Sequence, residues 1–258
     1  MSKEKVILAY SGGLDTTAII PWLKENFDYD VVCCCIDCGQ GEELDGLEER
    51  AKLSGASKLY IENIIDEFCD DYVMPCVKAG AVYENKYLLG TSMARPVIAK
   101  RLVEIARKEG ATAICHGATG KGNDQIRFDM TFLVLAPNVE IITLTRDMAL
   151  SRDYEINYLK EHGFEADFTK LKYSYNVGLW GTSICGGEIL DSTQGLPESA
   201  YLKQVTKTGS EELRLEFKNG EIHAVNGKVF EDKIAAIQKV EEIGAAYGIG
   251  QIGRASCR

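Results

Sequence analysis

The sequence predicts an α/β fold in which a parallel sheet is covered by helices on both faces. Short apolar runs at residues 6–8, 31–36 and 113–116 alternate with segments of helical period through the first 165 residues. Repeated β–α units of this kind form parallel sheets, which bind ligands at the carboxyl ends of their strands. From about Lys172 the pattern changes to a Gly-, Ser- and Tyr-rich stretch, then to hairpin signals and a closing helix. This change predicts a second unit of the α+β class.

The elements of the first unit have local boundary signals. Gly110 and Gly163 each follow the last residue of a helical pattern. Glu42 and Glu43 give one helix an acidic start, and Pro96 lies near the first turn of another. We expect strands at residues 6–8, 31–36, 58–61, 113–116 and 140–144, and helices at residues 14–24, 44–53, 64–78, 96–108, 125–135 and 151–162.

The second unit has fewer signals. Residues 213–217 alternate apolar and polar side chains, and the pairs Asn219-Gly220 and Asn226-Gly227 are typical of hairpin turns. Residues 232–247 have the period of a closing helix. We therefore place the first unit at residues 1–165 and the second at residues 170–252.

Composition indicates a cytoplasmic protein without a nucleic-acid or membrane partner. The 258 residues are 45% hydrophobic, enough for one substantial core and a smaller second one. No run approaches the ~18 apolar residues of a membrane span, and the first residues do not resemble a secretory signal. Lys and Arg number 29 against 39 Asp and Glu, so the net charge of −10 disfavours binding to nucleic acid.

The nine cysteines are expected to be reduced and mostly buried. Adjacent residues of a strand point to opposite faces, so the run at residues 33–35 cannot converge on one metal ion. Cys35 and Cys38 have CxxC spacing, but no second Cys or His pair completes a zinc site. No residue is assigned as a protein metal ligand.

The segment AYSGGLDTT, residues 9–17, joins the first strand to the first helix and predicts a phosphate site. Gly12 and Gly13 allow a tight turn and close approach of an anion, which the unpaired N–H groups of a helix start attract. The neighbouring Ser and Thr hydroxyls add donors, and Asp15 can cap the helix or hold a metal ion through water. The motif lacks the Gly-Lys-Ser/Thr ending of nucleoside triphosphatases and resembles the pyrophosphate loop of ATP pyrophosphatases. The alternative is an ordinary Gly-Gly turn.

Three further segments carry polar groups near expected strand or helix ends. Residues 116–127 (HGATGKGNDQIR) follow a strand and combine glycines with charged and amide groups, including Lys121, which favours a binding site. The alternative is a flexible surface turn. Residues 83–92 (YENKYLLGTS) offer phenols and hydroxyls, or aromatics that complete the core. Residues 172–183 contain Trp180, expected to pack, and hydroxyls that have no role unless a ligand meets them.

Together, the motifs AYSGGLDTT, GQGEE at residues 39–43, KAGAVYENKYLLGTSMARP and HGATGKGNDQIRF resemble the argininosuccinate synthase family from residue 3 to about residue 252. The resemblance implies a HUP-type, Rossmann-like ATP-binding domain at residues 1–165 and part of a synthetase and multimerisation domain at residues 170–252. It implies a carbon–nitrogen ligase of arginine biosynthesis, and of the urea cycle in some organisms, that uses ATP and Mg²⁺ to join citrulline and aspartate. The ureido oxygen attacks the α-phosphorus, and the aspartate amine then displaces AMP.

The resemblance also implies roles for individual residues, none of them as a general acid or base. ATP would be bound by residues Ala9, Tyr10, Ser11, Gly12, Gly13, Leu14, Asp15, Thr16, Thr17, Ile36 and Gly117. Citrulline would be bound by Tyr87, Ser92, Asn123, Arg127, Ser174 and Ser183, and aspartate by Thr119, Asn123 and Asp124.

Some positions depart from the family pattern. Thr17 replaces the usual Ser, Ile36 replaces a smaller residue, and residues 143–147 (TLTRD) lack the usual Ala-Pro-Trp-Arg. The family continues beyond this length with a citrulline-site glutamate and tyrosine and an arm that forms a homotetramer, and Ser256 stands near the glutamate position. Residues 252–258 resemble a translated sequencing adapter, so we expect a truncated reading frame whose residues 253–258 are an artefact. A tetramer is expected for the full-length family rather than for this shorter chain.

Two alternatives stay open. One is a catalytically inactive fragment that still binds ATP. The other is a different pyrophosphate-loop ATP pyrophosphatase acting on tRNA, which needs a basic surface or a spaced cysteine pair.

Overall fold

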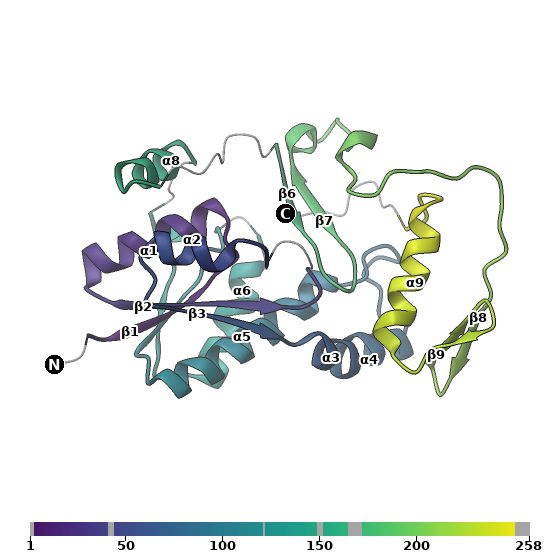
Figure 1. The fold of residues 1–258 in the computed structure, drawn as a ribbon, viewed down its shortest axis with the longest axis horizontal. Coiled ribbons are helices and arrows are strands. Elements are labelled where there is room, and N and C mark those ends of the chain that lie inside the picture. Colours follow the sequence, from purple (N-terminus) through teal and green to yellow (C-terminus); the bar gives the residue numbers. More distant parts are fainter. Residues whose placement is uncertain (1–2, 41–43, 121, 149–151, 165–171, 251–258) are drawn as a thin grey trace.

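A five-stranded parallel sheet forms the centre of the computed structural model, which describes residues 3–40, 44–120, 122–148, 152–164 and 172–250 (Figure 1). The strand order is β3-β2-β1-β4-β5, and all neighbouring strands are parallel. The strands are β1 (Lys5–Ala9), β2 (Asp30–Asp37), β3 (Lys58–Asn63), β4 (Ala113–Cys115) and β5 (Glu140–Ile142). The predicted parallel sheet is confirmed. Its order reverses between β1 and β4, which is where open α/β sheets bind ligands.

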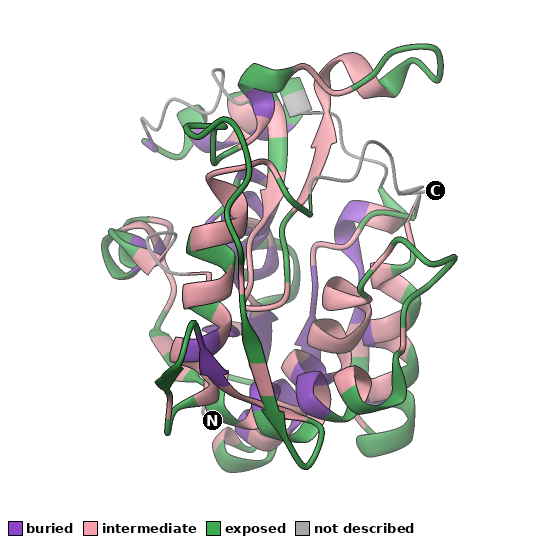
Figure 2. Cartoon of the chain, turned by 90° about the vertical axis from the view of Figure 1, so that its right-hand side faces the viewer, coloured by how far each residue is buried: buried purple, intermediate pink, exposed green. Residues whose placement is uncertain are grey.

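Helices cover both faces of this sheet. On one face, α1 (Leu14–Phe27) and α2 (Leu47–Leu53) pack on side chains such as Leu8 and Cys33; on the other, α5 (Gly90–Glu109) and α6 (Asp124–Leu135) pack on Ile7 and Cys34. Burial concentrates in this central layer, drawn purple in Figure 2. Alternate residues of each strand therefore serve different cores, as their period of two requires.

The cysteine run follows this alternation. Cys34 packs under α5, whereas Cys33 and Cys35 pack on the α1 face. Burial raises the pKa of the Cys33 and Cys34 thiols, and that of Cys38 to about 12, which keeps them protonated. Within the described ranges, no three His, Cys, Asp or Glu residues gather so as to hold a metal ion, and no helix is long and apolar enough to cross a membrane.

Helix α1 begins at Leu14 as expected, whereas α2 and α5 differ from expectation at their starts. α2 begins at Leu47 rather than at residue 44, because Gly46 has a φ of +69° and leaves the helical region. The acidic start at Glu42 and Glu43 lies outside the described residues. α5 begins at Gly90 rather than at residue 96, so Pro96 lies inside the helix and cannot donate to the carbonyl of Ser92.

The helix expected at residues 64–78 is a composite. It consists of α3 (Ile65–Phe68), a π-helical turn η2 (Cys69–Val73) and α4 (Met74–Ala79). The N–H of Met74 bonds to the carbonyl of Cys69, five residues back. Pro75 follows directly and has no N–H, so the regular ladder is interrupted at this point.

The last elements of the first unit are shorter than expected. β5 ends at Ile142, and Leu144 begins a short helix, α7 (Leu144–Asp147). Helix α8 (Arg152–Glu161) packs on α1 through Leu159 and Ala18. Ser151, the expected start of α8, and the expected unit boundary at residues 165–170 lie outside the described residues.

The described residues from 172 onward contain two small antiparallel sheets. Residues 172–186, in which no regular period was found, form a hairpin of β6 (Tyr173–Asn176) and β7 (Ser183–Gly186), followed by the 3₁₀ turns η3 (Gly187–Leu190) and η4 (Glu198–Ala200). A long extended segment then leads to a three-stranded sheet and α9 (Lys233–Ala245) at the right of Figure 1. The strands are β8 (Leu215–Lys218), β9 (Glu221–Val225) and β10 (Lys228–Val229).

The two hairpin turns of this sheet are confirmed. Asn219 and Gly220 join β8 to β9, Asn226 and Gly227 join β9 to β10, and all four have positive φ. Asp232 caps α9 by accepting a hydrogen bond from the N–H of Ile234 at 2.8 Å. Residues 253–258, the expected artefact, lie outside the described residues.

Candidate nucleotide-binding site

The loop between β1 and α1 presents open backbone donors at the carboxyl edge of the sheet. The first helical bond of α1 runs from the N–H of Thr17 to the carbonyl of Gly13 at 3.0 Å. The N–H groups of Leu14, Asp15 and Thr16 therefore point out of the helix start without a partner among the described residues. Gly13 is the N-cap residue, and no side chain caps the helix through a hydrogen bond. The expectation that Asp15 could cap α1 is therefore wrong. These unpaired N–H groups carry the partial positive charge of the helix N-terminus, which favours the binding of an anion.

The hydroxyls of the loop differ in their accessibility. Ser11 is exposed, and its Oγ lies 3.2 Å from Oγ1 of Thr16 and accepts weakly from the N–H of Gly13 at 3.4 Å. Thr17 is fully buried, and its Oγ1 lies 3.4 Å from the hydroxyl of Tyr10. Burial raises the pKa of Tyr10, which stays a neutral phenol beneath the loop. Ser11 and the backbone thus face outward, while Tyr10 and Thr17 support them from below.

Arg50 on α2 holds this loop in place. Its Nη1 donates to the carbonyl of Gly12 at 3.2 Å, and its Nη2 donates to the carbonyl of Asp45 at 3.1 Å. Gly12 has a φ of +74°, and a Cβ added there would lie 2.3 Å from Cδ1 of Leu47. The close approach of α2 therefore requires glycine at residue 12. It also brings a guanidinium charge beside the loop, which the sequence patterns did not reveal.

Gly117 lies across the edge from the loop, just after β4. A Cβ at this position would lie 3.1 Å from Cγ2 of Thr16 and 3.8 Å from Oγ1 of Thr145. Gly117 thus borders α1 on one side and α7 on the other. Ile36 lies deeper in β2: its side chain belongs to the core under α5, and its carbonyl accepts from Nε2 of Gln40 at 2.9 Å.

The start of α6 carries a charged cluster. Asp124 accepts from Nη1 of Arg127 at 2.8 Å and from Nε of Arg95 at 3.0 Å. Arg95 also donates through Nη2 to Oδ1 of Asn176 in β6 at 2.8 Å. The structure therefore brings together two residues expected to hold amino-acid substrates, Asp124 and Arg127. It adds Arg95, which stands in a quoted motif but had no assigned role.

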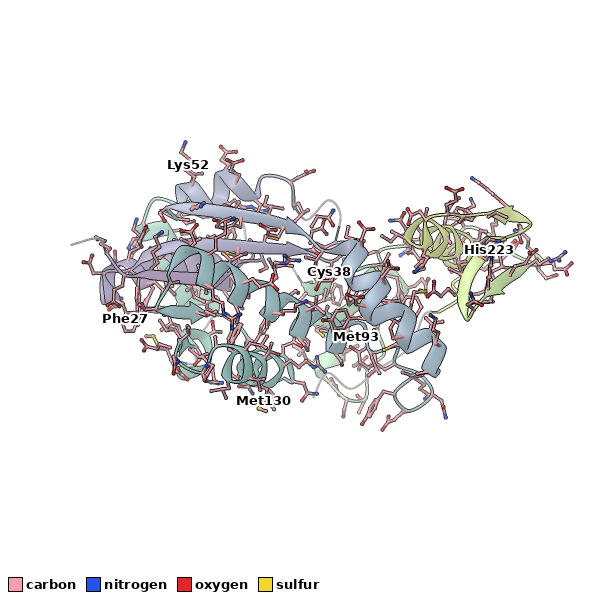
Figure 3. All side chains as sticks on the ribbon, turned by 90° about the horizontal axis from the view of Figure 1, so that it is seen from below. Phe27, Cys38, Lys52, Met93, Met130 and His223 are labelled. Carbon is pink, nitrogen blue, oxygen red and sulfur yellow. The ribbon has the colours of Figure 1, made fainter. Side chains whose placement is uncertain are left out.

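The link between β6 and β7 crosses the same edge. The N–H of Leu179 donates to the carbonyl of Cys38 at 3.0 Å, and the hydroxyls of Thr91 and Ser183 lie 3.4 Å apart. A Cβ on Gly90 would lie 2.2 Å from the Trp180 carbonyl, so this residue must be glycine. Trp180 packs, as expected. Cys38 and Met93 belong to the core beneath this contact (Figure 3).

The remaining candidate residues form no hydrogen bond to one another within the described ranges. Tyr87 and Ser92 are half-buried near the start of α5, and the backbone of Tyr87 pairs with Tyr83. Thr119, Asn123 and Ser174 are exposed. Asn123 immediately precedes α6 but does not cap it through its side chain. Lys121 lies outside the described residues.

A buried network supports the edge from below. His116, only 1% exposed, shares a hydrogen bond of 2.8 Å between its Nε2 and Oδ1 of Asp129. Nη1 of Arg146 donates to the other oxygen of Asp129 at 2.7 Å. Burial lowers the pKa of His116, so the ring is neutral, and its Nδ1 accepts from the N–H of Ala118 at 3.2 Å. These bonds fix the direction in which residues 116–118 leave β4.

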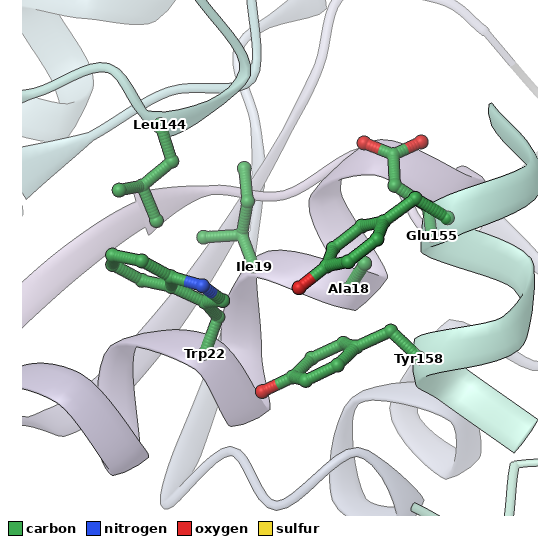
Figure 4. A pocket seen from close by; sticks show the side chains of 7 residues that line it. Ala18, Ile19, Trp22, Leu144, Glu155 and Tyr158 are labelled. Atoms are coloured by element: carbon green, nitrogen blue, oxygen red, sulfur yellow. The ribbon is translucent and has the colours of Figure 1, made fainter. Parts of the chain in front are cut away.

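Two hollows of the described structure lie beside α1 and α8. One, of about 10 Å³, is lined by Ala18, Trp22, Leu144 and Tyr158 among others, and is too small for more than one water molecule (Figure 4). A larger one, of about 210 Å³, lies toward the far end of α1, between Lys24 and His162. Neither of these two hollows is lined by a residue of the expected ATP, citrulline or aspartate sites.

Comparisons with known proteins agree with this geometry. Residues 5–165 match a family model described as the arginosuccinate synthase N-terminal HUP domain. Similar curated proteins include the argininosuccinate synthases of Lachnoclostridium phytofermentans, 58% identical, Agathobacter rectalis, 57% identical, and Carboxydothermus hydrogenoformans, 50% identical. These matches cover 97%, 97% and 96% of this chain but only 64%, 63% and 63% of the relatives. The chain spans less than two thirds of the length of these relatives.

Proposed function

Because this chain belongs to the argininosuccinate synthase family, we propose that it binds ATP at residues 9–17 and supplies the ATP-binding part of an argininosuccinate synthase. The proposed reaction joins citrulline and aspartate and releases AMP and pyrophosphate. The observation that carries the proposal is the row of open N–H groups at the start of α1, beside the switch point of the sheet. The proposed location is the cytoplasm.

The nucleotide would lie between the loop and Gly117. Backbone N–H groups of the loop would receive the phosphates, and Arg50 would add positive charge beside them. Asp15, in the first turn of α1, is the carboxylate that would hold Mg²⁺, since this ion commonly takes one or two protein carboxylates and completes its shell with phosphates and water. When bound, Mg²⁺ neutralises charge on the pyrophosphate leaving group.

The amino-acid substrates would lie over the start of α6. Citrulline would contact Tyr87, Ser92, Asn123, Arg127, Ser174 and Ser183, and aspartate would contact Thr119, Asn123 and Asp124. The Thr91–Ser183 contact supports this arrangement, because it holds the β6–β7 hairpin beside the start of α5. Arg127 suits a substrate carboxylate, which a guanidinium can bind through two parallel hydrogen bonds.

Positioning would supply most of the rate enhancement. The citrulline ureido oxygen attacks the α-phosphorus, and the aspartate amine then attacks the activated carbon and expels AMP. No side chain is assigned as general acid or base, because holding the reactants in line and neutralising the leaving group account for the gain.

The proposed assembly of the complete protein is a homotetramer. Helix α6 supports a contact between protein surfaces, because it exposes an apolar stripe on the side away from the sheet. Ile126, Met130 and Leu133 are each more than half exposed, and Met130 is visible in Figure 3. Apolar patches of this kind mark interaction sites.

The second candidate function is ATP binding without turnover. It is favoured by the length comparison, since over a third of the relative's length lies outside the match to this chain. A tRNA-directed pyrophosphatase is disfavoured by the net charge of −10.

Pyrophosphate release tests the proposal. The 258-residue chain, and the same chain extended with the C-terminal segment of a relative, are supplied with ATP and Mg²⁺, with citrulline, aspartate or both. We expect both chains to bind ATP, and the extended chain to release pyrophosphate only when citrulline is present. Release that is independent of citrulline, or that requires tRNA, would contradict the proposed reaction. Binding of ATP by both chains without any release would favour the second candidate.

A further inference from the structure

Thr145 carries a buried hydroxyl without a partner. It lies in α7, just after β5, and is 7% exposed. Its Oγ1 is the one buried side-chain oxygen or nitrogen in the described part of the chain that lacks a hydrogen bond. An unpaired buried hydroxyl disfavours the folded state, whereas an isosteric valine would carry no such penalty. A hydrogen-bond partner from outside the described residues, such as a bound ligand, would remove this penalty.

The neighbouring side chains do not fill this role. Thr143 of the same turn is fully engaged: its Oγ1 donates to Asp147 at 2.6 Å and accepts from Arg146 at 2.8 Å. Arg146 in turn directs its Nη1 to Asp129 and Gln125. Thr143 and Arg146 therefore bond to other side chains and not to the Thr145 hydroxyl.

Thr145 borders the open edge of the sheet. Its Oγ1 is 3.8 Å from the place where a side chain at Gly117 would begin, and the Thr16 methyl lies 3.1 Å from the same place. Gly117 therefore leaves a gap of about one atom between the phosphate loop and Thr145. An oxygen atom placed near this gap would be within reach of the hydroxyl.

We propose that Thr145 is a further nucleotide-binding residue, whose hydroxyl donates a hydrogen bond to an oxygen of the ribose or α-phosphate of ATP bound beside Gly117. The proposal rests on the proposed binding of ATP at residues 9–17. The nucleotide would then contact α1 on one side and the Thr145 hydroxyl of α7 on the other.

The test compares Thr145→Val with Thr112→Val. Both changes replace a hydroxyl with a methyl group, but Thr112 is exposed before β4, and its Oγ1 bonds to Glu4 at 3.1 Å, at the opposite edge of the sheet. ATP, AMP and pyrophosphate affinities are measured by calorimetry, and the melting temperature is measured without ligand. For Thr145→Val we expect ATP and AMP binding weakened about 5- to 10-fold, pyrophosphate binding changed less than about twofold, and no loss of melting temperature.

Several outcomes would overturn the proposal. If the wild type binds ATP and Thr145→Val binds it with the same affinity, the proposal is wrong. It is also wrong if Thr145→Val weakens the binding of pyrophosphate alone. A lowered melting temperature without ligand, together with Thr145→Ser binding ATP as weakly as Thr145→Val, would assign the residue a packing role instead. A wild-type chain that binds no ATP would overturn the proposed function and this proposal together.

Discussion

Arg95 and Asp124 are joined by a hydrogen bond of 3.0 Å between Nε and Oδ2. The same guanidinium reaches Asn176 in β6, so it connects the start of α6 to the second unit. A planar group with donors on two sides can serve both partners at once, which a lysine ammonium cannot do in the same geometry. Arg95 therefore holds the β6–β7 hairpin over the edge together with the Leu179–Cys38 and Thr91–Ser183 contacts and the packing of Trp180.

We expect Arg95→Lys to loosen the hairpin. Losing one charge-assisted hydrogen bond costs roughly 1 kcal/mol, and the amides of residues 173–186 should exchange with solvent several-fold faster. Hydrogen exchange detects the change. Arg101→Lys is the matched control, because Arg101 lies on the same helix and pairs with Glu67. Equal exchange of residues 173–186 in both variants would show that packing alone holds the hairpin.

The two loop glycines should respond differently to substitution. Gly13 has a φ of −73°, and an added Cβ would meet only Oγ of Ser11, at 3.4 Å. We expect Gly13→Val to fold with a melting temperature near that of the wild type but to lose ATP binding, because its side chain occupies the phosphate position.

Gly12→Val serves as the contrast. Its positive φ and the clash with Leu47 should lower stability by roughly 2 kcal/mol or more. Thermal unfolding and ATP calorimetry on both variants separate the two effects. Retained ATP affinity in folded Gly13→Val would refute the assignment of the loop.

Arg50→Met should weaken ATP binding while keeping most of the contact between α2 and the loop. Methionine retains an unbranched apolar stem but loses the bond to the Gly12 carbonyl and the charge beside the loop. We expect ATP affinity to fall about 10-fold or less. The loss should be larger at low ionic strength, because salt screens the charge of Arg50 in the wild type. Calorimetry at two salt concentrations measures it. Lys52→Met, on the same helix, is the control, and an equal loss in both variants would remove Arg50 from the site.

Most of the first unit could be predicted because its signals are local. Each strand is a short apolar run closed by polar or glycine residues, and the phosphate loop is recognised from the order of strand, glycines and helix. The start of α5 was missed because it depends on a distant partner, the backbone of Trp180 packed on Gly90. The β6–β7 hairpin was missed because its residues are nearly all half-buried, so no alternation of apolar and polar side chains marks the strands.

The site was predictable only in part for a similar reason. Contacts such as Arg50 to Gly12, 38 residues apart, and Arg95 to Asn176, 81 residues apart, join elements that are distant in the sequence and depend on the tertiary packing. A local pattern contains no such information. The unpaired hydroxyl of Thr145 likewise depends on the tertiary structure, because its neighbours Thr143 and Arg146 bond to other side chains.

Glu109, at the end of α5, should make stability depend on pH. Its side chain is 9% exposed, and its carboxylate accepts from Lys5 and Lys58, each at 2.6 Å, and from Tyr60. The hydrogen bonds from Lys5, and then those from Lys58 and Tyr60, lower its pKa from 4.5 to about 2. Because the folded pKa lies below the unfolded one, the stabilisation is complete above about pH 4.5 and is lost as the pH falls toward 2.

Glu109→Gln tests this dependence. At pH 7 we expect it to lower the free energy of unfolding by roughly 1 kcal/mol, a modest value because both lysines are partly exposed. The difference from the wild type should shrink as the pH falls below about 4.5, since the wild-type carboxylate then becomes protonated as well. Urea unfolding between pH 7 and pH 3 measures it, with Glu104→Gln as the control, because Glu104 is a half-buried glutamate of the same helix that pairs only with Arg101 among the described residues. A difference that stayed constant across this range would mean that the carboxylate charge contributes nothing and that the side chain acts through packing alone.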